Sequence, residues 1–155
     1  PPPPPFFTQK TAYEIVYLVS WAPEMCIRDR HRELTLLGET VRHAVDHVEV
    51  FPAPAHIVTV RMTSDELNSM CPVTGQPDLA TVEITYRPDR WCVESKSLKL
   101  YLWGFRDRAV FVEQLAAEIA DEIALTVEPH DVRVVVTQRP RGGIEVQATA
   151  ERSNP

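Results

Sequence analysis

The sequence has little of what marks several common classes of protein. Its 155 residues include only three cysteines, too few for a disulfide framework, so Cys71 and Cys92 are expected to be free thiols in a reducing cytoplasm. No apolar run approaches the roughly 20 residues that span a bilayer. A formal net charge of −6 argues against a general nucleic-acid binder. We therefore expect a cytoplasmic protein with no membrane partner and no direct nucleic-acid partner.

Several ligand-binding motifs are also missing. There is no Gly-x-Gly-x-x-Gly sequence among the five glycines, which excludes nucleotide binding in the Rossmann manner. The five histidines are scattered, and no Cys/His cluster has zinc-ligand spacing, so no metal site is expected. His43 and His47 lie four residues apart and could share a helix face, but this is a weak metal motif.

The first thirty residues differ from the rest of the chain. Residues 1–5 are all proline, and no basic start followed by an apolar segment and a cleavage site marks a secretory signal. The run Met-Cys-Ile-Arg-Asp-Arg at residues 25–30 resembles a translated sequencing adapter. We expect residues 1–30 to be a non-native or disordered segment, and residues 31–155 to form one domain.

Apolar periodicity predicts an α+β fold. Alternation at Val82, Ile84 and Tyr86 is typical of a half-buried strand, whereas residues 111–127 repeat apolar positions every three or four residues, as a helix does. Asp107 is a candidate N-cap for that helix. The remaining assignments are a linker over 51–54, a turn or short helix over 63–68, a helix over 98–105, a turn over 139–143, and strands over 56–62, 80–87, 91–94, 131–137 and 144–148. The order predicts an antiparallel sheet with two helices on one face.

Such a two-layer body leaves the second sheet face and the sheet edges open. We therefore expect a symmetric homo-oligomer, with sites at its subunit interfaces.

The run Cys-Pro-Val-Thr-Gly-Gln-Pro-Asp, from Cys71 to Asp78, is the most informative stretch. A cysteine acts as a nucleophile through its thiolate, and a nearby carboxylate can move the protons that such chemistry needs. Cys71 lies between a polar segment and a turn, away from any apolar stripe, which favours catalysis over a buried structural thiol. Asp78 could also act only as a cap for the strand that follows.

Three further groups are candidate binding residues. Glu94, Ser95, Lys96 and Lys99 precede a very apolar run, so they form either a pocket rim or a solvated helix face. Glu113 lies beside the apolar stripe of the long helix, either at its edge or as a buried binding acid. Residues 141–143, Arg-Gly-Gly, could present a cation and open backbone N–H groups to phosphate, or could form a plain hairpin turn.

The strings CPVTGQPD, VESKSLKLYLWGFR and PRGG together resemble the QueF family of nitrile reductases in queuosine biosynthesis. The resemblance runs from about Glu33 to about Gln147. It implies a tunnelling fold that assembles into rings. It also implies reduction of 7-cyano-7-deazaguanine, a 7-deazapurine nitrile, to 7-aminomethyl-7-deazaguanine with two NADPH.

The resemblance implies roles for individual residues. Cys71 would attack the nitrile carbon to form a covalent thioimide, and Asp78 would supply or shuttle protons. The expected groups are substrate contacts at Val93, Glu94, Ser95, Val112 and Glu113, and NADPH phosphate contacts at Lys96, Lys99 and Arg141.

One position departs from the family pattern. The family has Phe-His-Glu where this chain has Phe111-Val112-Glu113, and valine can neither donate a hydrogen bond nor transfer a proton. We therefore expect Val112→His to raise turnover on the nitrile.

Two alternatives remain at the level of the sequence. One is a related amidinotransferase, which would add ammonia to the same nitrile carried on transfer RNA; Lys96, Lys99 and Arg141 favour the reductase instead. The other is a non-catalytic purine- or pterin-binding protein of the tunnelling fold, against which the pair of Cys71 and Asp78 argues.

Overall fold

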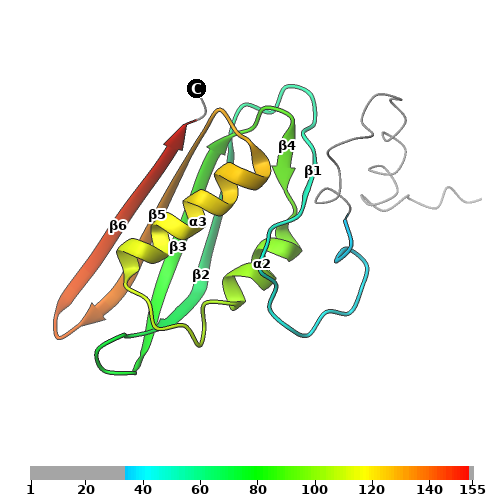
Figure 1. Ribbon diagram of the computed structural model, residues 1–155. Helices are drawn as coiled ribbons and strands as arrows, with labels where there is room; N and C mark the ends of the chain where they lie inside the picture. The colour runs from blue at the N-terminus through cyan, green and yellow to red at the C-terminus, as the bar shows by residue number, and fades with distance from the viewer. Residues whose placement is uncertain (1–33, 154–155) are drawn as a thin grey trace, which may run out of the picture. The chain divides into compact units, whose positions relative to one another are not determined.

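The computed structural model of the chain describes residues 34–153 (Figure 1). The segment 1–30 and its boundary with the predicted domain lie outside the described residues. The elements are, in chain order, β1 (Val50–Pro52), β2 (Val60–Met70), β3 (Pro77–Arg87), β4 (Trp91–Val93), α2 (Ser95–Trp103), α3 (Val112–Val127), β5 (Asp131–Arg141) and β6 (Ile144–Ser153).

The larger sheet has four antiparallel strands in the order β2-β3-β5-β6. Alternate residues of β3 and β5, such as Val82, Ile84 and Val134, are buried, as expected for strands with one covered face. Helix α3 packs on β5 and β6, and α2 lies against β2, on the same face of the sheet (Figure 1). The predicted α+β class, with an antiparallel sheet and two helices, is confirmed.

Strand β2 is longer than the sequence predicts. The predicted turn or short helix over 63–68 is wrong, because these residues continue the strand through a bulge. The register passes from Ser64 opposite Val82 to Leu67 opposite Ala80, so two residues of β2 oppose one of β3. The polar residues of this segment break the apolar alternation that would have predicted a strand. They are tolerated because β2 is an edge strand, paired with another strand of the sheet on one side only.

Helix α3 confirms the predicted apolar stripe, with Leu115, Ile119 and Ile123 all buried. The predicted N-cap Asp107 is wrong: Phe111 occupies that position, in extended conformation and without a side-chain cap bond. The helix ends at Val127, where Glu128 adopts a left-handed conformation before Pro129.

A small sheet of β1 and β4 closes one side of the core. The predicted linker over 51–54 is partly wrong, because Val50–Pro52 pair with Trp91–Val93, and the predicted short strand over 91–94 is confirmed. The fully buried Tyr86 joins the two sheets, since its hydroxyl accepts a hydrogen bond of 2.9 Å from the N–H of Val93.

The hairpin of β5 and β6 turns at Gly142 and Gly143. Their φ angles of +59° and +82° match a tight turn that places both central residues at positive φ, which glycine tolerates. Strand β5 therefore runs through Arg141, farther than the predicted end at Thr137, and places Arg141 at the tip of the sheet.

The face of the sheet away from the helices is polar. Residues such as Glu83, Thr85 and Arg133 occupy its strand positions, and no helix covers it within residues 34–153 (Figure 1). In the same part of the chain, no helix is both long and apolar enough to cross a membrane.

Candidate active site

Cys71 begins the loop that joins β2 to β3. Its N–H donates to the carbonyl of Gln76 over 2.8 Å, and its own carbonyl accepts from the N–H of Gly75 over 2.9 Å. Gly75 has a φ of +66°, a conformation that a residue with a Cβ rarely adopts. The Gly-Gln-Pro sequence therefore closes a tight loop with the thiol at its base.

The loop wraps hydrogen-bond donors around the sulfur of Cys71. The Thr74 hydroxyl and then the backbone N–H groups of Thr74 and Val73 lower the pKa of the thiol from 9.0 to about 7. Donors that stabilise the thiolate more than the thiol have this effect, and the positive charge of Arg141 adds a smaller contribution. With this pKa the thiol ionises near neutral pH. Cys71 is also only partly buried, so a reagent in solution can reach it.

Asp78 lies on the second residue of β3, on the buried face. Its side chain is paired in register with Ser69 of β2, and both residues are buried. The Asp78 carboxylate forms an ion pair with the Arg141 guanidinium through Oδ1 and Nη1. A buried carboxylate needs such a partner to stay ionised.

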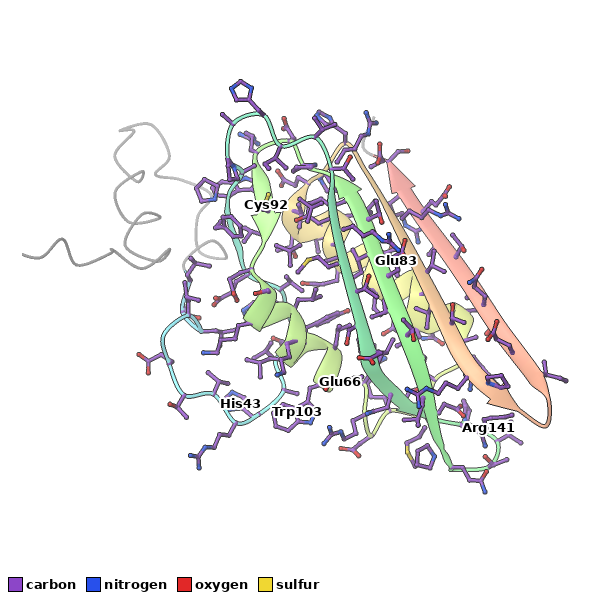
Figure 2. All side chains as sticks on the ribbon, turned by 180° about the vertical axis from the view of Figure 1, so that it is seen from behind. His43, Glu66, Glu83, Cys92, Trp103 and Arg141 are labelled. Carbon is purple, nitrogen blue, oxygen red and sulfur yellow. The ribbon has the colours of Figure 1, made fainter. Side chains whose placement is uncertain are left out.

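Arg141 contacts the same loop with its second branch. Its Nη2 donates to Oε1 of Gln76 over 2.8 Å and to Oγ1 of Thr74 over 3.4 Å. Arg141 lies at the end of the sheet where the loop between β2 and β3 also turns (Figure 2). The resemblance implies that Arg141 contacts cofactor phosphate. In this structure its guanidinium instead contacts Asp78 and two residues of the loop that Cys71 begins.

The connection between α2 and α3 is joined to the end of β2. The N–H of Met70 donates to Arg108 over 2.8 Å, and the N–H of Val110 donates to Met70 over 3.2 Å. Because Met70 precedes Cys71, this pairing brings the thiol loop close to the start of α3. There Val112 is 8% exposed and packs in the core, whereas Glu113 is exposed in the first turn.

Glu94 acts as the N-cap of α2. Its two carboxylate oxygens accept hydrogen bonds from the N–H groups of Lys96 (2.8 Å) and Ser97 (2.7 Å). Val93 is buried directly before it, and Ser95 is exposed. The ionised cap suits the positive end of the helix dipole. The contacts seen for Glu94 are therefore those of a helix cap.

A cleft of about 880 Å³ runs between α2 and β2. Lys99 and Arg106 line it, and neither has a carboxylate within ion-pair distance among residues 34–153. Trp103 lines it as well, 38% exposed, with the Arg106 guanidinium 5.6 Å from its ring centroid. Figure 2 shows Trp103 on α2 and Glu66 on β2, which both line the cleft. Unpaired cations beside an exposed indole suit an anionic aromatic ligand.

Lys96 also lines the cleft, but its ammonium group is already engaged. It donates to the carbonyl oxygens of Leu36 and Glu39 and so holds the N-terminal loop against α2. Glu49 fixes the same loop, since its Oε1 accepts from the N–H and hydroxyl of Thr35 over 2.9 and 2.6 Å.

The structure therefore separates the predicted residues into two groups. Cys71, Asp78 and Arg141 gather at the tip of the sheet, while Ser95, Lys96 and Lys99 line the cleft. The lining of the cleft also includes Asn68 and Leu79, the chain neighbours of Ser69 and Asp78.

Sequence reasoning missed four residues of these two groups: Thr74, Gln76, Trp103 and Arg106. Thr74 and Gln76 lie inside the CPVTGQPD run, and the requirement of a thiolate for hydrogen-bond donors was the signal that could have identified Thr74. Within the described part of the chain, no three His, Cys, Asp or Glu side chains could hold a metal ion together.

Comparisons with known proteins identify the relatives of this chain. The family model of the QueF-like protein matches residues 77–155. The NADPH-dependent 7-cyano-7-deazaguanine reductase of Alkalilimnicola ehrlichii is 42% identical over 104 residues, which cover 67% of this chain and 81% of the relative. The enzyme of that name from Rhodopirellula baltica is 46% identical over 101 residues, or 64% of this chain and 84% of the relative. The enzyme of that name from Nitratidesulfovibrio vulgaris is 38% identical over 131 residues, which cover 80% of this chain and 79% of the relative.

A solved structure is also similar. The archaeosine synthase QueF-Like in its apo form aligns with a TM-score of 0.59 and 26% identity, over 63% of this chain and 96% of that one. The family match covers just over half of the chain, and the sequence relatives are aligned over most of their own length. This chain belongs to the QueF-like protein family.

Proposed function

We propose that this chain reduces the nitrile of 7-cyano-7-deazaguanine to 7-aminomethyl-7-deazaguanine with two NADPH, through a thioimide on Cys71. The observation that carries the proposal is the thiol of Cys71 among its hydrogen-bond donors, with the ion-paired Asp78 just beyond the end of the same loop. A thiol with a pKa of about 7 supplies a large fraction of thiolate at neutral pH. The names of the curated relatives supply the substrate and the cofactor.

The first half of the reaction forms the covalent intermediate. The Cys71 sulfur bonds to the nitrile carbon while one π bond of the cyano group breaks toward nitrogen. That nitrogen takes up a proton from solvent, relayed by Asp78, which leaves a C=N bond joined to sulfur. Arg141 keeps Asp78 ionised and therefore ready to accept the proton.

The second half consumes the thioimide. Two NADPH molecules would each supply one hydride, the first to the thioimide carbon and the second to the imine carbon. Between these steps the C–S bond breaks, and Cys71 leaves as a thiolate, for which a lowered pKa is favourable. Asp78 delivers the protons that complete the amine.

The residues of the cleft fit the cofactor. Lys99 and Arg106 offer cations to phosphate groups, and Trp103 offers a face for stacking. Lys96 lines the same cleft, and its ammonium group holds the loop beside them. The N–H edge of the 7-deazaguanine base suits the exposed carboxylate of Glu113, because an ionised acid only accepts hydrogen bonds.

The other substrate contacts remain predictions. Ser95 is exposed and free to contact the base, Val112 lies one residue from Glu113, and Val93 and Glu94 support the start of α2. We further propose a ring-forming homo-oligomer of the tunnelling fold with sites at subunit interfaces. The long edge strands β2 and β6 support this, since each offers an unpaired edge in the four-stranded sheet.

Mass spectrometry of the protein with the nitrile and no NADPH tests the covalent step. We expect the protein mass to rise by one substrate molecule, with the adduct on the Cys71 peptide and none in Cys71→Ala. Adding NADPH should then release the amine with consumption of two NADPH per product. The absence of any adduct would contradict the proposal, and an adduct released only by ammonia would favour the amidinotransferase reaction.

A further inference from the structure

Arg141 occupies a position that joins the two reacting groups of the loop. It ends β5 directly before the Gly142–Gly143 turn, and its side chain is 35% exposed. One Nη branch meets Asp78, and the other meets Gln76 and Thr74. We propose that Arg141 is a positioning residue that couples the acid Asp78 to the nucleophile Cys71 through the Thr74 hydroxyl. Only the naming of nucleophile and acid rests on the proposed function.

The Thr74 hydroxyl is the link to the sulfur. Its oxygen accepts from the Arg141 Nη2 group over 3.4 Å and from the N–H of Gln76 over 3.4 Å. A hydroxyl has two acceptor lone pairs and one proton. With both lone pairs facing donors, the proton of Thr74 is available to an acceptor in the same loop, the sulfur of Cys71. The hydroxyl bond to that sulfur is also the largest influence on its ionisation.

Asp78 depends on the same guanidinium. Its Oδ1 atom is buried, and within residues 34–153 Arg141 is the group that forms an ion pair with it and balances its charge. Without the cation, the buried carboxyl would favour its protonated form and could no longer accept a proton.

The planar guanidinium suits this double task. Its two Nη groups point in fixed directions, so one branch can serve the acid while the other serves the Thr74 and Gln76 oxygens. A lysine ammonium at the same position would bring the charge but could not hold both branches in this fixed geometry.

The pH dependence of iodoacetamide labelling at the Cys71 peptide tests this role without substrate or cofactor. In the unsubstituted protein we expect half-maximal labelling near pH 7. In Arg141→Gln we expect the midpoint to rise by about one pH unit, which slows labelling at pH 7 by about fivefold. Arg141→Lys should shift the midpoint in the same direction by less. Arg139→Gln on the same strand is the matched control, since Arg139 is exposed and should leave the midpoint unchanged.

Thr74→Val tests the link with Arg141 intact. We expect the same upward shift, and the double variant with Arg141→Gln should shift little further, because both changes remove one chain of contacts. An unchanged midpoint in Thr74→Val or in a folded Arg141→Gln would overturn the inference. A loss of NADPH binding in Arg141→Gln, with unchanged labelling, would assign Arg141 to the cofactor and leave the proposed reaction intact.

Discussion

At the scale of single residues, the two described cysteines differ because their surroundings differ. Donors from Thr74 and Val73 lower the pKa of Cys71, whereas burial raises the pKa of Cys92 in β4. The same side chain is therefore suited to act as a nucleophile in one place and as a small apolar core residue in the other. The contrast gives a direct prediction for the pH dependence of the reaction.

The value of kcat/KM for the nitrile should rise as pH increases through about 7, because the thiolate of the free enzyme is the reacting form. Below that pH the thiol is protonated, and the rate should fall about tenfold per pH unit. Steady-state rates across a pH series check the midpoint. A midpoint near the ordinary cysteine pKa of about 8.5 would contradict the proposal that the hydrogen-bond donors around Cys71 lower its pKa.

Val112 combines an unusual identity with a buried position. We expect Val112→His to raise turnover on the nitrile, since an imidazole next to Glu113 could donate to substrate. The change should also lower the free energy of unfolding by about 1–3 kcal/mol, because a polar ring replaces a buried valine. Steady-state rates and urea unfolding measure the two effects.

Val127→His is the matched control for that change, since Val127 is fully buried at the other end of α3. It should lose stability without any gain in rate. If Val112→His also loses stability and gains no turnover, position 112 does not face the substrate.

At the scale of elements, strong apolar patterns predicted the structure well. Helix α3 and strand β3 were predicted correctly because their buried residues, such as Ile119 and Val82, recur at the spacing of a helix and of a strand. Strand β2 does not, since the polar residues beside its bulge are held by pairing with β3, a non-local partner. The N-cap was missed for a similar reason: Asp107 suits a cap, but the pairing of Met70 with the α2–α3 connection sets where α3 begins.

The candidate site divides in the same way. The motif containing Cys71 and Asp78 was evident from the sequence because nucleophile and acid lie seven residues apart. The contacts of Arg141 were not, since they depend on the hairpin of β5 and β6 folding back beside β3. Spacing along the chain carries no information on such a meeting of distant strands.

The start of α2 gives a prediction that distinguishes a helix cap from a substrate contact. Glu94→Ala should lower the free energy of unfolding by about 1 kcal/mol, because two helix N–H groups lose their acceptor. Glu94→Asp, a good N-cap residue, should retain most of that stability. If the cap is the main role, Glu94→Asp also keeps the KM for the nitrile. A large rise in that KM with unchanged stability would return Glu94 to the substrate site.

Helix α2 also carries the proposed cofactor contacts. On binding, NADPH should quench the indole emission of Trp103 by energy transfer, because reduced nicotinamide absorbs where indole emits. Trp103→Phe should lose most of this quenching, although Trp21 and Trp91 remain. Titration of both proteins with NADPH, in the absence of nitrile, measures the effect. Full quenching in Trp103→Phe would place the cofactor outside the cleft of α2 and β2.

At the scale of the whole molecule, the two groups of site residues raise the question of which subunits supply them. Cys71, Asp78 and Arg141 lie at the tip of the sheet, and Lys99 and Arg106 lie in the cleft. In a ring, the cleft of one subunit could serve the thiol of its neighbour. The polar open face and the two long edge strands leave room for such neighbours.

Mixing two inactive variants tests whether sites are shared. We expect Cys71→Ala and the double variant Lys99→Gln/Arg106→Gln to be nearly inactive alone. After subunit exchange, a shared site can combine the intact thiol of one variant with the intact cations of the other, which should restore about a quarter of normal activity. If all of these groups act within one chain, every site keeps a defect and activity stays at the level of the separate variants. Recovery of NADPH oxidation after mixing therefore distinguishes a site at a subunit boundary from one contained in a single chain.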